Sequence, residues 1–424
     1  MRWPLPGARR PDTAAALSSG GFPALRHRDF RRYILGQGVS LVGFWMQSVA
    51  QGWLVYRLSG SELVLGSVAF AAYLPVLCLA PVAGVVADRL PKRQLILLTQ
   101  SLAMLLALTL GTLAALDLAT VPIVAVTACL LGVVGAFDLP IRQAFLVEMV
   151  GPDDLPSAIA LNASIFNTAR VVGPALAGVL AATVGEAPCF LLNGLSYLGV
   201  IWALLHIHPR QSATPDRSHR DLRAGLRYVR GQPVQAALLV ALGLVSGLSL
   251  QANILMPSLS QRTFAQGATG YGLLLTAYGI GAVLSALRLA SRRWSPGQHR
   301  RNLLGGLAVF GIGLLGVAAS PRFDMALCCQ MVAGLGMIRF TATTNTLIQL
   351  MVDDRYRGRV MGLHTVMFMG TAPVGSLVLG GIAQPLGARA ALLLSGTVPL
   401  AVAAALAWRL KPGELFSRPA TPAT

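Results

Sequence analysis

The feature that most constrains this chain is a series of long apolar runs, separated by short polar or arginine-rich segments. A helix needs about 20 consecutive apolar residues to cross the hydrocarbon core of a bilayer. Strands of a membrane barrel are shorter and alternate apolar with polar residues, which these runs do not. The runs cover residues 30–56, 63–87, 94–116, 120–147, 156–183, 187–207, 234–261, 269–291, 302–319, 323–350, 358–383 and 387–409. The pattern therefore predicts an all-α membrane protein with twelve transmembrane helices.

The composition excludes a soluble globular fold. Hydrophobic residues make up 54% of the chain and charged residues only 12%, whereas an ordinary soluble domain carries about 25% charged residues. A chain with so few charges cannot cover a water-facing surface of the size that its length requires.

The runs divide into six, a polar linker, and six more, which suggests an internal repeat. When the fourth run is superposed on the tenth, Asp138 aligns with Arg339. Six spans per half leave both halves in the same membrane orientation, as in a parallel repeat. The sequence thus predicts two six-helix bundles, residues 30–207 and 234–410, related by a pseudo-twofold axis and joined by the linker 208–233.

The positive charges indicate how the chain lies in the membrane. The formal net charge is +18, from 34 Lys and Arg against 16 Asp and Glu, and 27 of the 34 fall in the tails and loops of one face. Such a bias predicts that this face is cytoplasmic, with the tails 1–29 and 411–424 on it. Within the linker, Asp221–Arg230 can form a basic amphipathic helix suited to an anionic leaflet surface, or can be a plain solvated connection.

Several motifs carry a family resemblance. The segment 84–93 between the second and third runs resembles the Gly-x-x-x-Asp-Arg-x-Gly-Arg-Lys loop of the major facilitator superfamily, with Pro91 where that family usually has Gly. The segments 170–178, 43–56 and 354–362 resemble the exporter branch that contains the enterobactin exporter and macrolide-efflux proteins. The resemblance spans essentially the whole chain and implies a transporter of the bacterial cytoplasmic membrane.

The first motif is interpreted as a conformational latch. Its residues are Gly84, Asp88, Arg89, Lys92 and Arg93. Glycine permits close helix contact, and the carboxylate can pair with a helix N-terminus or an arginine. Such a pair can hold the halves in one state and break in the other. The alternative is a turn whose snorkelling charges only fix topology.

The second motif, in the fifth run, contains Gly173, Pro174 and Gly178. These residues allow tight packing and a bend. By resemblance, this helix would prevent leak and bias the cycle toward export, while generic small-residue packing is the alternative.

Ionisable residues inside the runs are functional candidates because charge within a bilayer is costly. By resemblance, the fourth and tenth helices line a central cavity, so Asp138 and Arg339 are expected to face each other across it. We predict that Asp138 takes up a proton during transport while Arg339 tunes its pKa, with Arg170 as a second partner. A permanent buried pair is the alternative. Arg142 and Glu148 are interpreted as a structural ion pair.

A broad, lightly polar cavity is predicted from amide and hydroxyl side chains spread over several runs. Each of these could instead be a hydrogen bond between helices. The cavity candidates are Gln47, Gln51, Asn162, Asn253, Thr341 and Asn345.

These features predict a secondary exporter of a siderophore, a macrolide-like drug or a similar amphipathic compound, working by proton antiport with alternating access. Uptake or facilitated diffusion of a metabolite, and a non-transporting membrane sensor or assembly partner, are the alternatives. The sequence contains no phosphate-binding loop, zinc-ligand motif or nucleophile elbow, so we expect no enzyme activity, metal or cofactor. The expected partners are the substrate and the lipid bilayer, without nucleic acid, and the expected state is a monomer.

Overall fold

We analysed a computed structural model of the chain. It describes residues 22–207, 222–291, 296–353 and 355–409, apart from the side chains at 80–81, 84–85, 87–89, 222–224 and 296–297. Within these ranges the secondary structure is helical. Residues 1–21 and 410–424 and most of the linker, for which the sequence predicts a cytoplasmic position, lie outside the described residues. The end of the predicted tail 1–29 is described and forms η1 (Pro23–Arg26) and the start of α2 (Arg28–Ser59).

The first half consists of five long helices. They are α2 (Arg28–Ser59), α3 (Glu62–Arg89), α4 (Lys92–Ala115), α5 (Val121–Thr183) and α6 (Ala187–Leu205), preceded by the 3-10 turn η1 (Pro23–Arg26). The second half begins after the short helix α7 (Leu222–Arg230). It consists of α8 (Pro233–Leu248), η2 (Leu250–Leu255), α9 (Met256–Ser258), η3 (Leu259–Thr263), α10 (Gly267–Ala290), α11 (Pro296–Ala319), α12 (Phe323–Met351), α13 (Arg357–Met369), α14 (Ala372–Leu386) and α15 (Ala388–Arg409).

These helices provide twelve membrane-length segments. Ten helices in the described ranges are long and apolar enough to cross a membrane. One of them, α5, has 63 residues and turns back at Gly151, whose backbone has φ 74° and ψ 175°, so it holds two spans. The remaining span is α2, which carries no charged residue from Tyr33 to Tyr56. The predicted all-α membrane fold is confirmed.

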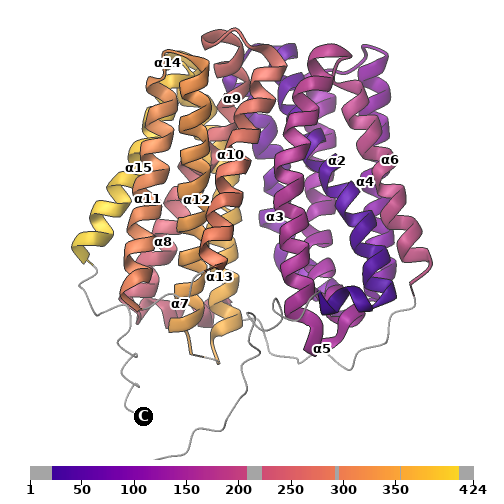
Figure 1. Ribbon diagram of the computed structural model, residues 1–424, viewed down its shortest axis with the longest axis vertical. Helices are drawn as coiled ribbons and strands as arrows, with labels where there is room; N and C mark the ends of the chain where they lie inside the picture. The colour runs from indigo at the N-terminus through magenta and orange to yellow at the C-terminus, as the bar shows by residue number, and fades with distance from the viewer. Residues whose placement is uncertain (1–21, 208–221, 292–295, 354, 410–424) are drawn as a thin grey trace, which may run out of the picture.

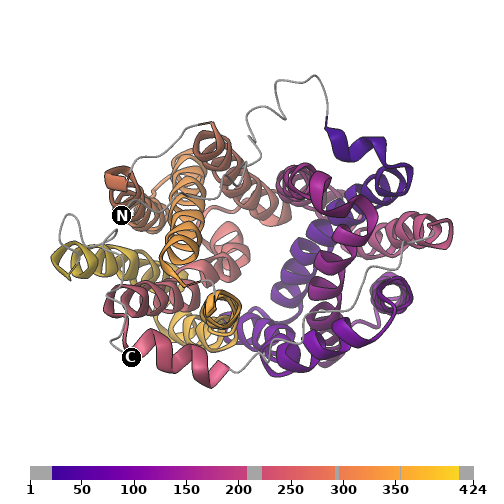
Figure 2. The ribbon, with the colours of Figure 1, turned by 90° about the horizontal axis from the view of Figure 1, so that it is seen from below.

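The two halves lie side by side as separate bundles (Figures 1 and 2). Their packing is repeated, because α3 packs on α5 as α10 packs on α12, and α4 packs on α6 as α11 packs on α15. The contact between the halves obeys the same symmetry. It is made mainly by α3 with α14 and by α5 with α10. Helix α10 is the counterpart of α3, and α14 is the counterpart of the second span of α5, so the two contacts are equivalent when the halves are exchanged.

Two predicted runs are broken where the sequence analysis expected continuous spans. Within 234–261, α8 gives way to the 3-10 helix η2 and the π-helical turn η3, and Pro257 supplies no amide donor at this break. Within 358–383, α13 ends at Met369 and α14 starts at Ala372, followed by Pro373. Both breaks lie near the contact between the halves, because η2, α13 and α14 each contact α3 of the first half.

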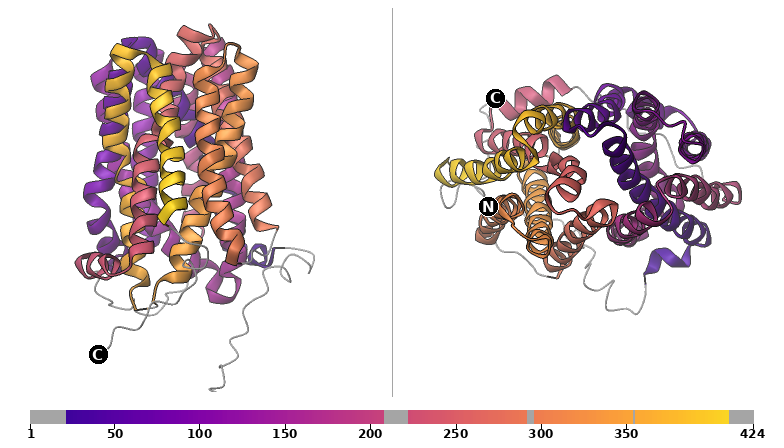
Figure 3. Two further views of the ribbon diagram at one scale, coloured as in Figure 1. Left: turned by 90° about the vertical axis from the view of Figure 1, so that its left-hand side faces the viewer. Right: turned by 90° about the horizontal axis from the view of Figure 1, so that it is seen from above.

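We call the two ends of the bundle the linker end and the far end. The linker end contains α7 and the turns around 90–91, 151 and 352–356, and the far end contains the turns around 60–61, 116–120, 184–186, 264–266, 320–322 and 387. Helix α7 lies at the linker end, beside the second half (Figures 1 and 3), where it packs on α13.

Candidate functional site

The two halves cross most closely at glycines near the far end. A Cβ atom built on Gly66 of α3 would lie 3.2 Å from the Cα of Gly380 on α14. A Cβ atom built on Gly272 of α10 would lie 2.6 Å from the Cα of Gly178 on α5. Close backbone approach of this kind requires small residues. At each crossing two helix backbones therefore come into close contact, and at the second the Thr269 hydroxyl of α10 also donates to the Gly178 carbonyl at 3.4 Å.

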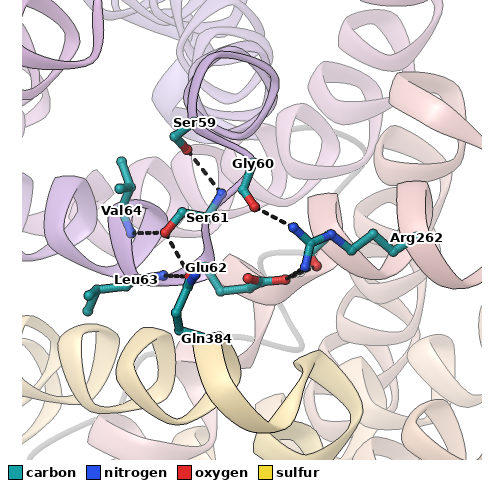
Figure 4. Close-up of polar contacts among 9 residues, drawn as sticks. Ser59, Gly60, Ser61, Glu62, Leu63, Val64, Arg262 and Gln384 are labelled. Carbon is teal, nitrogen blue, oxygen red and sulfur yellow. Dashed lines mark hydrogen bonds and ion pairs between the residues drawn. The ribbon is translucent and has the colours of Figure 1, made fainter.

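A polar latch connects the halves beside these crossings (Figure 4). Glu62, at the start of α3, is only 1% exposed, although it is charged. Its carboxylate accepts hydrogen bonds from the Ser258 hydroxyl and from Arg262 Nη1, the latter at 3.2 Å. Arg262 also donates to the Gly60 carbonyl, and the Ser61 hydroxyl donates to Gln384 Oε1 at 2.7 Å. The latch thus joins α3 to both η3 and α14.

Local sequence explains why Glu62 stands at this point. Gly60 adopts the left-handed conformation with φ 60° and ends α2, as glycine commonly does. Ser61 then caps α3 by accepting a hydrogen bond from the Val64 amide. Glu62 follows as the first residue of α3, where the helix dipole favours a negative charge. The three-residue turn therefore aims a carboxylate at the neighbouring half.

A single cation, Arg170, lies between aromatic rings of the two halves on the α5 and α10 side. The guanidinium of Arg170 on α5 stacks over Trp45 of its own half at 5.6 Å and over Tyr278 of α10 at 5.3 Å. Across α10, Asn253 accepts a hydrogen bond from Gln330 at 2.9 Å. No carboxylate among the described residues pairs with Arg170. A guanidinium that lacks an acidic partner at this depth is a functional candidate.

The predicted motif of the fifth run lies at this same contact. A Cβ atom on Gly173 would lie 2.5 Å from the Trp45 Cβ, so Gly173 packs on α2 within the first half. The Pro174 carbonyl would lie 2.6 Å from a Cβ atom on Gly272, and Gly178 faces the same glycine. Within the motif, Gly173 therefore contacts its own half, while Pro174 and Gly178 contact the other half.

Asp138 does not pair with Arg339 in this structure. Its carboxylate forms an ion pair with Arg142, four residues along the same helix. It also accepts hydrogen bonds from the Thr99 hydroxyl at 2.7 Å and from Gln100 at 2.9 Å, both on α4. Asp138 thus faces a neighbouring helix of its own half rather than the other half. The interpreted Arg142–Glu148 pair is also wrong.

Arg339 occupies the equivalent place in the second half. Its guanidinium donates to Asn302 Oδ1 of α11 at 2.8 Å and 3.2 Å. Since α11 corresponds to α4, both members of the predicted pair point at the outer neighbour within their own bundle. The repeat alignment identified equivalent positions, but these positions face away from each other. Arg170, the second expected partner, stacks on aromatic rings instead.

The predicted latch of the 84–93 segment is described only in part. The side chains of Asp88 and Arg89, and the burial of Gly84, lie outside what the structure describes. Lys92 pairs with Glu148 at 2.7 Å. The Arg93 guanidinium donates to backbone carbonyls at the end of α6. Both described cations of the motif therefore bind within the first half.

Some of the cavity candidates form hydrogen bonds between helices, and one forms a hydrogen bond within its own helix. Gln47 is 4% exposed and accepts a hydrogen bond from Asn193 of α6 at 2.6 Å, so it connects helices. Asn253 likewise connects η2 to α12, and Thr341 donates back to its own helix. Three further candidates, Gln51, Asn162 and Asn345, are half-buried.

Sequence reasoning missed the latch of Glu62 and Arg262. Glu62 falls one residue before the predicted run 63–87 and Arg262 one residue after the run 234–261, so both lie outside the runs in which ionisable residues are functional candidates. Arg262 is one of four arginines at the far end. The structure gives each of these four a partner. The pairs are Arg57 with Glu186, Arg262 with Glu62, Arg322 with Asp324, and Arg389 with the Ser320 carbonyl. Arg322 has its acidic partner two residues away, but Arg57 and Arg262 pair with carboxylates 129 and 200 residues away, so spacing in the sequence did not indicate these two pairs.

Chemically, the described site offers carboxylates, a cation and aromatic rings, but no metal site. No group of three or more His, Cys, Asp or Glu side chains is placed to hold a metal ion in the described ranges. Glu62 and Asp138 are carboxylates at helix contacts.

Comparisons with known proteins agree with this architecture. A family model described as transmembrane secretion effector matches residues 19–420. The staphyloferrin A transporter of Staphylococcus aureus is 26% identical over 350 residues, which cover 82% of this chain and 87% of that protein. The multidrug efflux pump Tap of Mycolicibacterium fortuitum is 27% identical over 400 residues, covering 91% and 95%. The crystal structure of a bacterial homologue of the human lysosomal transporter Spinster, inward-facing and occupied, superposes with a TM-score of 0.73 at 14% identity, covering 95% of this chain and all of that one.

Proposed function

This chain belongs to the transmembrane secretion effector family of major facilitator transporters, and we propose that it exports a siderophore, a macrolide-like drug or a similar amphipathic compound in exchange for protons. The printed names of its relatives, a staphyloferrin A transporter and a multidrug efflux pump, support this substrate class. In this proposal the proton gradient supplies the energy, and the chain needs neither a cofactor nor an enzymatic activity.

The observation that carries the proposal is the way in which the halves meet. Their closest contacts are glycine crossings near the far end, joined by the latch around Glu62. Alternating access requires contacts that form in one state and break in the other. Two backbones that touch at glycines can part with little side-chain rearrangement at the glycines themselves, and the latch must give up a few hydrogen bonds. The contact is therefore suited to opening and closing.

We further propose that the linker end faces the cytoplasm. Most of the arginines and lysines belong to the tails and loops of this end, which favours a cytoplasmic position. Three of the four arginines of the far end form ion pairs, and the fourth, Arg389, donates to a backbone carbonyl. With this orientation, a state latched at the far end is inward-facing and ready to take substrate from the cytoplasm.

Asp138 remains our proposed proton carrier, with Arg142 in place of Arg339 as its ion-pair partner. The carboxylate lies within a span and also accepts hydrogen bonds from Thr99 and Gln100 of α4. A movement of α4 against α5 would change both contacts at once.

Arg170 is our proposed contact for an anionic or electron-rich group of the substrate. It crosses the contact between the halves, between two aromatic rings and without an acidic partner among the described residues. An arginine fork binds carboxylates in a bidentate way. The aromatic rings beside it can receive the apolar body of an amphipathic compound.

Efflux from loaded cells tests the direction and the substrate class. Cells that express the chain would be loaded with a fluorescent macrolide or with a siderophore, and the retained compound would be followed with and without a protonophore. Faster loss that the protonophore abolishes supports the proposal. Faster accumulation would favour uptake, and no change with any compound, in a correctly inserted protein, would favour a non-transporting sensor or assembly partner.

A further inference from the structure

A cavity lies between α10, α11 and α12 toward the linker end of the second half. Its volume is about 170 Å³, and its polar lining residues are Ser285, Arg288, Gln298, Arg301, Asn302 and Arg339. It belongs to one half, on the outer side of α12 where Arg339 meets α11. The cavity is therefore separate from the contact between the halves that the proposed transport cycle uses.

Among its described lining residues, the cavity has three positive charges and no negative one. Arg288 comes from the last turn of α10, Arg301 from the first turns of α11, and Arg339 from the middle of α12. Arg288 and Arg301 both act electrostatically on Arg339. None of the three forms an ion pair with a carboxylate among the described residues. Three like charges that converge without a counter-ion repel one another, and a bound anion relieves that repulsion.

A buried hydroxyl in the same wall lacks a hydrogen-bond partner. Ser285 is 2% exposed, and its Oγ finds no partner among the described residues. Buried polar groups in proteins are nearly always satisfied. A donor left open beside three guanidinium groups matches an acceptor-rich ligand that occupies the cavity.

The Arg339 guanidinium is held in position for this role. Asn302 accepts two of its hydrogen bonds, at 2.8 Å and 3.2 Å, and a Cβ atom on Gly305 would lie 3.4 Å from its Cζ. Asn302 is neutral, so it fixes the direction of the guanidinium without neutralising its charge. The cation therefore keeps its attraction for an anion.

We propose that this cavity binds a phosphate group through Arg288, Arg301, Arg339 and the Ser285 hydroxyl. Guanidinium groups match the oxygen pairs of a phosphate in geometry and charge, and a tetrahedral anion can meet donors that approach from three helices. The phosphate can be free in solution or carried by the headgroup of a membrane phospholipid. Since the cavity is near one end of membrane-spanning helices, both sources reach the same donors.

Binding measurements on the purified full-length chain test the proposal. Inorganic phosphate would be titrated in detergent, and nanodiscs with 20 mol% phosphatidylglycerol would be compared with nanodiscs of phosphatidylcholine alone, with thermal unfolding and native mass spectrometry as readouts. Stabilisation by inorganic phosphate identifies a free-anion site. Retention of phosphatidylglycerol without a response to inorganic phosphate identifies a lipid-headgroup site. A response to neither probe overturns the proposal.

Two variants that remove the same charge provide the specificity control. Arg301→Gln removes a cavity donor, while Arg300→Gln removes the neighbouring arginine, which donates to the Ala407 carbonyl at 3.2 Å. Loss of one charge-assisted contact weakens binding by about tenfold or more, so Arg301→Gln should lose the response and Arg300→Gln should keep it. Equal losses in both variants would show a general charge effect and contradict the site.

The conservative variant Ser285→Ala covers the case in which an arginine variant fails to fold. It leaves all three charges in place and removes only the unpartnered hydroxyl. Weaker phosphate or phosphatidylglycerol binding with unchanged unfolding of the ligand-free protein supports the site, and unchanged binding overturns the hydroxyl's part in it. None of these readouts depends on transport, so the site can fail while the proposed function stands, and the reverse.

Discussion

Replacing Glu62 with glutamine should open the far end of the protein. The carboxylate is almost completely buried, and it accepts hydrogen bonds from Ser258 and Arg262 across the contact between the halves. The substitution Glu62→Gln keeps the shape of the side chain and removes its charge. Its other oxygen, Oε2, has no hydrogen-bond partner among the described residues. If the glutamine amide takes that place, a buried donor is left unsatisfied.

The size of the effect follows from these contacts. A hydrogen bond to a charged group contributes about 1.5–3 kcal/mol, but glutamine can still accept from Ser258, and the Arg262 side chain is 57% exposed. Water screens the exposed Arg262 guanidinium, so its interaction with Glu62 contributes little to stability. We expect the state closed at the far end to lose about 1–2 kcal/mol of stability relative to the open state, which changes the ratio of closed to open molecules by about 5–30-fold.

Distances between spin labels across the far end would measure this change. Leu118→Cys lies in the α4–α5 turn of the first half, and Gln266→Cys lies before α10 in the second half, both at exposed positions. In a background without the native cysteines, the labelled wild type should give mainly the short distance. Glu62→Gln should transfer a large part of the population to a longer one.

A matched control is Glu186→Gln. Glu186 is also a buried carboxylate at the far end, and it accepts two hydrogen bonds from Arg57, at 2.8 Å and 3.2 Å, but both residues belong to the first half. Its substitution should lower stability without changing the distance between the halves. If both variants lengthen the distance equally, or if Glu62→Gln leaves it unchanged, the latch reasoning is refuted.

Three further predictions concern the contact between the halves and the proposed coupling. The Gly272→Leu side chain would enter the space of Gly178. This variant should lose most transport while the protein still elutes as a folded monodisperse species. Gly135→Ala is the control, because a Cβ atom there has no neighbour within 4 Å, and it should transport normally. Asp138→Asn should abolish the protonophore-sensitive part of efflux in the loaded-cell assay and leave expression intact, and undiminished efflux would exclude it as the carrier. Arg170→Gln should raise the half-saturating concentration of a carboxylate-bearing substrate by about tenfold and that of a cationic one much less, so equal changes for both would argue for a purely structural role.

The helices were predictable from the sequence because bilayer thickness fixes the length of an apolar run. The turn at Gly151, with φ 74°, separates two helical spans that correspond to the predicted runs 120–147 and 156–183. The breaks inside 234–261 and 358–383 were not predictable in the same way. Apolar residues continue through both breaks, and hydropathy does not distinguish a 3-10 or π turn from an α-helix.

The pairing of Asp138 was not predictable because a repeat identifies equivalent positions but not the direction in which a side chain points. Both Asp138 and Arg339 turn to the polar residues of the adjacent outer helix, Thr99 and Gln100 in one half and Asn302 in the other. The third run, 94–116, and the ninth run, 302–319, each carry amide or hydroxyl residues near the linker end, and these residues indicated possible partners within each half. A buried charge tends to find its nearest polar partner within the same bundle.

Coupled proton and substrate movement in everted membrane vesicles tests the central claim most directly. The vesicle lumen would be acidified by respiration and followed with a pH-sensitive dye, and an exported compound from the loaded-cell assay would then be added. The account predicts that the compound accumulates in the lumen while the lumen loses protons, and that neither occurs with Asp138→Asn. Accumulation without proton loss, or accumulation that persists after the gradient is collapsed, would contradict proton-driven export.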